Sequence, residues 1–238
     1  MKNVIPVTQR ELAACFFSPI AYVTGFLFLL ATGLYFILVT LAPGAEASMR
    51  PLFEVMSVVL VFVVPLLTMR TISEELSSGT IESLMTAPVT ETEVILGKFL
   101  GVLLFYVGTL ATTGLYLGLI AQYSEPEVGL VVFGYLGMIL LGALYIAVGI
   151  FASACTRHQL LAAVFSASIL AGMTILADEI GPLLPDIWHR LLAQINIFEH
   201  FEAFAKGVFD TSALVYFVSA TVFFLFLAAR ILESRRWR

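Results

Sequence analysis

Long hydrophobic stretches without charge alternate with short polar segments along this chain. These stretches are residues 12–45, 51–69, 99–124, 128–156, 159–177 and 211–229. Asp, Glu, Lys and Arg are absent from all of them, apart from Glu54 near the start of the second. A helix rises about 1.5 Å per residue, so roughly 20 apolar residues cross the hydrocarbon core of a membrane. Because lipid offers the backbone no hydrogen-bond partner, the pattern predicts six transmembrane helices.

We therefore expect an all-α integral membrane protein in which residues 1–238 form a single transmembrane domain. The expected spans are residues 19–42, 51–69, 92–121, 129–154, 159–177 and 211–231. They leave an inner loop at residues 70–91 and an outer loop at residues 178–210.

Local signals mark the start of two spans. Ser18 is followed by Pro19, and serine suits the N-cap of a helix while proline suits its first turn. Thr90 and Glu93 have the spacing of a capping box, in which each side chain bonds the backbone of the other residue. The first and third spans should begin at these positions.

The residues before the first span predict a short amphipathic helix at 8–17. A second capping-box pattern, Thr8-x-x-Glu11, suits its start. Ten residues are too few to cross a bilayer, so we expect this elbow helix to lie in the membrane interface. Its expected anchors are Arg10 at the headgroups and Phe16 and Phe17 in the acyl boundary. The alternative is that the helix only extends the first span into water.

The composition excludes several classes of protein. Hydrophobic residues make up 60% of the chain and charged residues only 12%, whereas a soluble domain has roughly 45–50% and about 25%. A soluble enzyme and a disordered chain are thus excluded. The net charge of −5 also argues against binding to nucleic acid, which requires clustered positive charge. The two cysteines form neither a disulfide framework nor a metal-ligand pattern.

The distribution of Lys and Arg predicts the orientation. With six spans, both termini lie on the same side of the membrane. Only Arg50, Arg190 and Lys206 fall on the opposite side, and all other Lys and Arg residues share the side of the termini. The positive-inside rule then places both termini in the cytoplasm.

The chain shows no sign of chemistry of its own. No ionisable side chain lies near the middle of an expected span, where ion-coupled transporters keep such groups. Gly97-Lys98 lacks the preceding glycines of a nucleotide-binding loop, and the three histidines lack zinc-site spacing. We expect no catalytic residue, no metal site and no cofactor in this chain.

The inner loop has the pattern of a short helix with an apolar face. Gly79 suits the end of one helix, Thr80 can cap the next, and Glu82 suits its positive N-terminus. Pro88 ends this second helix. Its apolar face consists of Ile81, Leu84 and Met85. An ordinary connector needs no such face, so we interpret the segment as a docking element for a cytoplasmic partner.

This loop also resembles a known family, the permease subunits of type-2 ABC exporters. The resemblance lies in the string Glu75-x-x-x-Gly79-Thr80-Ile81-Glu82-x-Leu84-Met85-x-x-Pro88-Val89, followed by Gly97-Lys98. Further segments that fit are Phe17–Tyr22, Glu199–Gly207 and Glu233–Trp237. Together they are most similar to the gliding-motility and nitrous-oxide-reductase-maturation branch of that family.

The resemblance implies a permease that works with a separate ATPase. It implies an N-terminal elbow helix, six spans, a cytoplasmic coupling helix at about residues 80–87, and re-entrant helices between the fifth and sixth spans. Two permease chains, identical or homologous, would form the path across the bacterial inner membrane. Two ABC ATPase subunits would bind ATP and Mg²⁺. A periplasmic or membrane auxiliary protein is a further partner that the family allows.

Two groups of site residues follow from the resemblance. The residues that would couple to the ATPase are Glu74, Glu75, Gly79, Thr80, Ile81, Glu82, Leu84, Met85, Pro88 and Val89. The residues that would close the outer mouth of the path are Phe198, Phe201, Phe204 and Gly207. The alternative for the outer helices is that they only cover the ends of the spans.

Two other functions compete with a permease. The first is a passive channel or an ion-coupled transporter, and the lack of charge in the middle of the spans disfavours ion coupling. The second is a membrane scaffold that anchors a cytoplasmic ATPase without moving a substrate. The apolar face of the inner loop disfavours a plain channel but is equally compatible with a scaffold.

Overall fold

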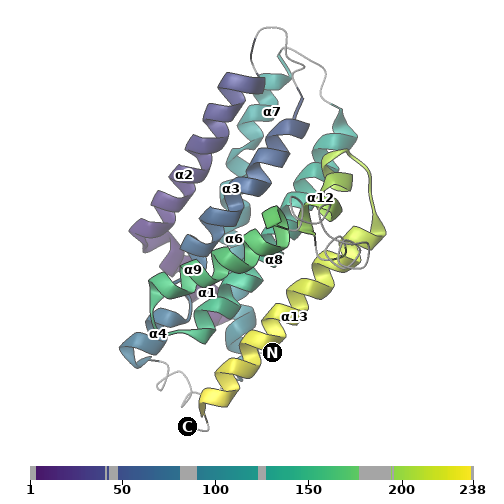
Figure 1. Ribbon diagram of the computed structural model, residues 1–238. Coiled ribbons are helices and arrows are strands. Elements are labelled where there is room, and N and C mark those ends of the chain that lie inside the picture. Colours follow the sequence, from purple (N-terminus) through teal and green to yellow (C-terminus); the bar gives the residue numbers. More distant parts are fainter. Residues whose placement is uncertain are drawn as a thin grey trace.

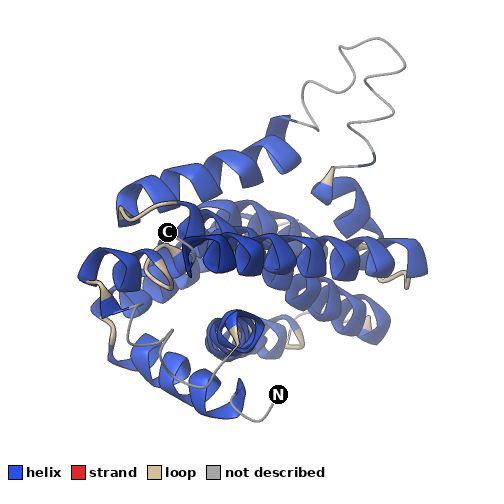
Figure 2. Ribbon diagram, turned by 90° about the horizontal axis from the view of Figure 1, so that it is seen from below, coloured by secondary structure: helices blue, strands red, loops and turns tan. Residues whose placement is uncertain are grey.

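The computed structural model describes residues 4–40, 42, 48–80, 90–122, 127–176, 194 and 196–236. Within these ranges all regular structure is helical, and the helices form an elongated bundle (Figures 1 and 2). In Figure 1, α2 and α13 lie on opposite edges of the bundle, α4 lies at its lower end and α12 toward its upper end.

The helices follow the hydrophobic stretches of the sequence. Their bounds are α1 (Val4–Phe17), α2 (Pro19–Tyr35), α3 (Arg50–Thr68), α4 (Ser73–Ser78), α6 (Glu91–Thr112), α7 (Gly114–Ile120), α8 (Val128–Cys155), α9 (Gln159–Ala171), α12 (Ile197–Ala205) and α13 (Thr211–Arg236). Two π-helical turns, η1 (Phe36–Thr40) and η2 (Gly172–Leu176), continue α2 and α9.

Five described helices are long and apolar enough to cross a membrane. They are Pro19–Thr40, Arg50–Ser78, Glu91–Ile120, Val128–Cys155 and Thr211–Ser234. The expected fifth span corresponds to a shorter apolar helix, Gln159–Ile175. Five of the six expected spans thus have the length of a membrane-crossing helix, and the crossing by Gln159–Ile175 stays a prediction.

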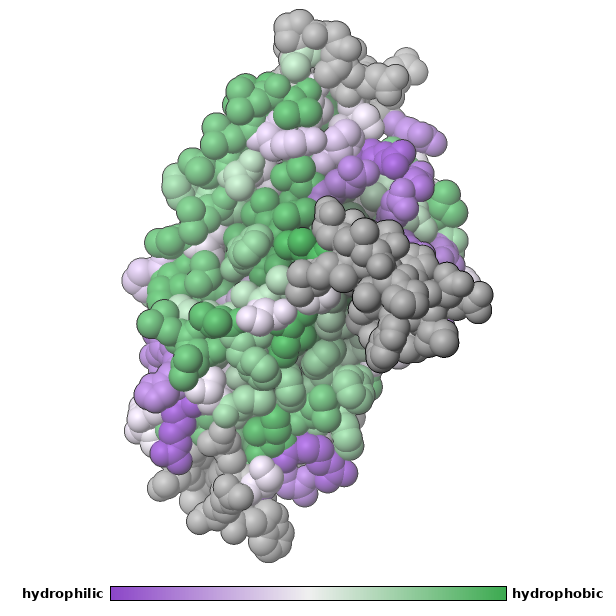
Figure 3. Space-filling view, in the orientation of Figure 1, coloured by the Kyte–Doolittle hydropathy of each residue, from purple (hydrophilic) through white to green (hydrophobic). Residues whose placement is uncertain are grey.

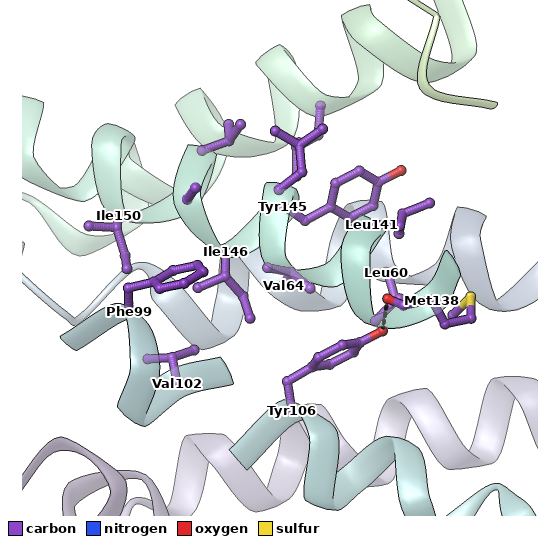
Figure 4. Close-up of a cluster of buried hydrophobic side chains, with 14 of the residues drawn as sticks. Leu60, Val64, Phe99, Val102, Tyr106, Met138, Leu141, Tyr145, Ile146 and Ile150 are labelled. Carbon is purple, nitrogen blue, oxygen red and sulfur yellow. Dashed lines mark hydrogen bonds between the residues drawn. The ribbon is translucent and has the colours of Figure 1, made fainter. Parts of the chain in front are cut away.

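Helix α8 lies at the centre of the bundle, because it packs against α3, α6, α9, α12 and α13. Small residues let its neighbours approach closely, as is common between membrane helices. A Cβ atom added to Gly142 would collide with the ring of Tyr106, and one added to Gly149 would collide with Thr68. The Tyr106 hydroxyl donates to the Met138 carbonyl oxygen at 2.8 Å within this apolar core (Figure 4).

The outer surface of the bundle is apolar along its middle. Exposed hydrophobic side chains include Phe26 on α2, Leu38 on η1, and Val215 and Phe223 on α13. Figure 3 shows this broad hydrophobic zone, with the hydrophilic residues gathered toward the two ends of the molecule. A surface of this kind is suited to contact with lipid rather than water.

Two of the helix starts agree with the local signals. Helix α2 begins at Pro19 after Ser18, and α6 begins after Thr90, whose side chain forms a capping box with Glu93. The expected start of the elbow helix was wrong, because α1 begins at Val4 and the Thr8 hydroxyl donates to the Val4 carbonyl oxygen at 2.9 Å. Thr8 therefore lies inside the helix.

Candidate functional site

Lys98 lies where α1, α4 and α6 meet, and only 4% of its side chain is exposed. Its ammonium donates to Oε2 of Glu11 at 3.1 Å, to Oε1 of Glu75 at 2.9 Å and to the Thr71 carbonyl oxygen at 2.7 Å. These three hydrogen bonds use all three donors of the ammonium. We call these four residues the Lys98 junction.

The junction depends on a close approach of α1 to α6. A Cβ atom on Gly97 would lie 2.6 Å from Cβ of Val7, and one on Gly101 would lie 2.7 Å from Cβ of Glu11. Glycine at these two positions lets α1 lie directly against α6. The Glu11 carboxylate therefore comes within reach of Lys98, although the two residues are 87 positions apart.

The charges of the junction are largely withdrawn from solvent. The Glu11 and Glu75 side chains are 15% and 16% exposed. Buried charges are tolerated when they are paired, and removing one partner of a buried pair typically costs about 3–5 kcal/mol. The junction therefore ties both α1 and α4 firmly to α6.

A second ion pair connects α4 with the start of α2. Nε of Arg70 donates to Oε2 of Glu74 at 2.8 Å, and Nη2 donates to Oε1 at 2.9 Å. The remaining nitrogen, Nη1, donates to Oγ of Ser18 at 3.1 Å. Planar, bidentate pairing of this kind has a fixed geometry. Glu74, an expected coupling residue, thus has a partner within the bundle.

Ser153, near the end of α8, holds the start of α4. Its hydroxyl accepts from the backbone N–H of Ile72 at 3.1 Å and of Ser73 at 2.9 Å, and donates to the Met69 carbonyl oxygen at 3.0 Å. The first N–H groups of a helix lack partners within that helix. The Ser153 hydroxyl, on α8, accepts hydrogen bonds from two N–H groups at the start of α4. Helix α8 therefore positions α4 directly.

Helix α4 ends at Gly79, as the sequence predicted. Gly79 has φ +73°, a left-handed conformation that glycine adopts readily and a β-branched residue does not. The Thr80 hydroxyl follows at 2.8 Å from that of Ser78. The other expected coupling residues, Ile81, Glu82, Leu84, Met85, Pro88 and Val89, lie outside the described residues.

A cavity of about 390 Å³ opens beside the Lys98 junction. It lies among α1, the start of α2, the end of α3 and α4, and Arg10 lines it together with Glu11 and Arg70. Cys15 also lines it, and burial, together with the nearby Glu11 carboxylate, raises the pKa of this thiol to about 12.

The expected anchors of the elbow helix all lie on α1. Phe17 is 87% exposed, and Phe16 is 51% exposed with its ring edge-on to that of Phe105 at 5.5 Å between centroids. Arg10 is exposed and faces the cavity beside the Lys98 junction. The position of these side chains in a membrane interface stays a prediction.

At the other end of the bundle, α12 carries the residues expected at the outer mouth. Phe201 and Phe204 are buried against α8, where a Cβ atom on Gly137 would lie 2.6 Å from Cβ of Phe204. Gly207 follows α12 and has φ +78°, and it lies close to the backbone of Leu130. Two of the three phenylalanines therefore hold α12 on α8.

Phe198 is half-buried and lines a second cavity of about 460 Å³ between α3 and α12. Glu54, Glu199 and Glu202 lie around the same cavity. In the part of the chain that the structure describes, no three His, Cys, Asp or Glu side chains are grouped as metal ligands. A role of α12 as an outer gate stays a prediction.

The sequence did not predict the ion pairs of the Lys98 junction. Lys98 and Glu11 were not expected to meet, and Ser153 and Arg70 were not singled out as supports of α4. One signal was available, because Lys98 stands at the edge of a long uncharged stretch and between Gly97 and Gly101. A lysine so placed needs a partner, and the glycines mark where another helix can approach.

Comparison with known proteins shows the class to which this arrangement belongs. The sequence model of the ABC-2 family transporter proteins matches residues 13–233, so the chain belongs to this family. It is accordingly a multi-pass membrane permease, of a kind that generally pairs with ABC ATPase subunits. No curated protein matched the chain.

Proposed function

We propose that this chain is the permease subunit of an ATP-driven exporter and that residues 80–89 dock on a separate ABC ATPase. In this proposal, the Lys98 junction carries the movement of the docked segment to α1 and α6, and so to the translocation path. ATP and Mg²⁺ bind to the ATPase and not to this chain.

One observation carries this proposal. The expected docking segment begins just after α4 and ends just before α6, and the Lys98 junction joins these two helices to each other through Glu75. A displacement at the segment therefore reaches α4 and α6 together. Through Glu11 it also reaches α1, which leads into the first span.

The assembly follows from the same reasoning. Gln159–Ile175 completes a set of six spans, and both termini face the cytoplasm with the docking segment. Six helices enclose a path only when two such bundles combine, so two copies, or one copy with a homologous permease, pair with two ATPase subunits. The sequence strings quoted above support membership of the gliding-motility and nitrous-oxide-reductase-maturation branch.

A scaffold and a channel predict different biochemical behaviour. A scaffold would bind the ATPase without altering its rate of hydrolysis. A passive channel would not bind it at all. The exporter binds the ATPase, stimulates hydrolysis and loses this stimulation when the docking segment is displaced.

Gly79→Val displaces the segment with little other change. Valine is strained in a left-handed backbone conformation by about 1–2 kcal/mol. If the segment relieves this strain only when it leaves the ATPase, the docking equilibrium weakens about tenfold. The measurement is co-purification of the coexpressed ATPase and its rate of hydrolysis in nanodiscs.

Gly129→Val is the matched control. An added Cβ meets nothing within 4 Å at either glycine, but of the two Gly79 alone has a positive φ. The two variants therefore differ in backbone strain and not in available space. Equal ATPase binding and equal hydrolysis in the two variants would contradict the docking role.

A further inference from the structure

The cavity beside the Lys98 junction has walls of two kinds. Its charged lining consists of Arg10, Glu11, Arg70, Glu74, Glu75 and Lys98. Its apolar lining includes Ala14, Ile20 and Leu67. A site that joins a compact charged region to an apolar wall suits an amphiphile better than a fully water-soluble molecule.

The charges around the cavity do not all cancel in place. Arg70 and Glu74 satisfy each other, whereas Lys98 is shared by two carboxylates, Glu11 and Glu75. The two carboxylates around Lys98 therefore carry one more negative charge than its ammonium neutralises. Oε2 of Glu75 is shut off from solvent, whereas the Glu11 side chain is 15% exposed, so Glu11 is the carboxylate of this pair that a ligand in the cavity can reach.

Arg10 supplies the opposite excess. Its guanidinium makes no hydrogen bond or ion pair with any residue that the structure describes, although it lines the same cavity. Among the described residues that line it, the cavity thus offers an unpaired cation, Arg10, and one surplus carboxylate charge. The complementary ligand carries a phosphate next to an ammonium.

We infer that this cavity binds the headgroup of an aminophospholipid, with its phosphate at Arg10 and its primary ammonium directed to the Glu11 carboxylate. The guanidinium matches a phosphate with two parallel hydrogen bonds. The ammonium carries three N–H donors, and the Glu11 carboxylate can accept a hydrogen bond from it. The acyl chains leave past Ile20 and Leu67 toward the lipid.

This inference rests on the part of the proposed function that places α1 at the membrane surface. It predicts that a lipid of that leaflet bridges α1 and α4 next to the docking segment. A trimethylated headgroup keeps the phosphate and the positive charge but has no N–H donor. A phosphatidylglycerol keeps the phosphate but has no ammonium. Both should therefore bind less well than phosphatidylethanolamine.

Native mass spectrometry of the purified full-length permease measures this preference directly. Dioleoyl phosphatidylethanolamine, phosphatidylcholine and phosphatidylglycerol are titrated separately, and bound lipid is counted per chain. Phosphatidylethanolamine should bind about tenfold more tightly than the other two, which is the effect expected from charge-assisted hydrogen bonds. Arg10→Gln should lose about the same factor.

Arg157→Gln is the matched control for Arg10→Gln. Arg157 is also an exposed arginine, but it does not line the cavity. The wild-type preference should persist in this variant. Water-soluble glycerophosphoethanolamine, which lacks acyl chains, should fail to displace the lipid at equal concentration.

Four results would overturn the inference. They are equal binding of the three lipids, tighter binding of phosphatidylglycerol, equal behaviour of the two arginine variants, and displacement by the soluble headgroup. The ATPase is absent from this experiment. A permease that selects the aminophospholipid but fails to recruit its ATPase would therefore refute only the proposed function. A permease that recruits its ATPase but shows no preference among the lipids would refute only the lipid site.

Discussion

Replacing Lys98 by methionine should loosen α1 and α4 from α6 while leaving the spans folded. The change removes three hydrogen bonds from one ammonium, at 2.7, 2.9 and 3.1 Å, and leaves Glu11 and Glu75 with uncompensated charge. The loss of one partner from a buried pair costs about 3–5 kcal/mol. Since about 1.4 kcal/mol is a factor of ten in an equilibrium constant, local opening should become roughly a hundredfold to a few thousandfold more frequent.

Hydrogen exchange in nanodiscs measures this opening helix by helix. Amide protection should fall in α1 and α4 and persist in α8. The triple variant Lys98→Met/Glu11→Gln/Glu75→Gln should regain most of the protection, because neutral partners leave no buried charge unpaired. Lys206→Met is the control, since Lys206 belongs to a half-exposed surface pair at the end of α12, toward the opposite end of the bundle from α4. Unchanged protection of α1 in the single variant, or no recovery in the triple variant, would refute the reasoning.

Two further predictions concern neighbouring side chains. Ser153→Ala should lower the free energy of unfolding by about 1–3 kcal/mol, because it leaves two buried N–H groups without a partner. Thermal denaturation in detergent should give this variant a lower melting temperature than the control variant Ser168→Ala. Equal melting temperatures of the two variants would contradict the prediction. Cys15 should resist N-ethylmaleimide at pH 8, because a thiol with a pKa of about 12 is protonated there and only the thiolate reacts. A Cys155→Ser variant isolates Cys15, and rapid labelling of that folded variant would refute the assignment.

The parts of the fold that the sequence predicted well are governed by short-range interactions. Long apolar stretches gave five helices of membrane-crossing length, because burial in lipid requires continuous apolar surface and satisfied backbone. The helix starts at Pro19 and Glu91 and the helix end at Gly79 follow from residues within one turn. Capping and backbone conformation depend only on such near neighbours.

The parts that the sequence did not predict depend on tertiary contacts. Helix α1 extends back to Val4, where a Cβ atom on Gly97 would meet both Val4 and Val7, so packing on α6 overrides the capping-box signal at Thr8. The Lys98 junction joins residues 23 and 87 positions apart. Nothing in local periodicity specifies which carboxylates a lysine will meet at that distance along the chain.

Site-specific photocrosslinking in cells tests the central claim, that residues 80–89 dock on a separate ATPase, most directly. A photoreactive amino acid is placed at Glu82, in the expected docking segment, and separately at Glu125, in a loop expected on the opposite side of the membrane. The account predicts a crosslink to the coexpressed ABC ATPase from position 82 and none from position 125. A crosslink from position 125, or no crosslink from position 82 in a complex that still co-purifies, would contradict it.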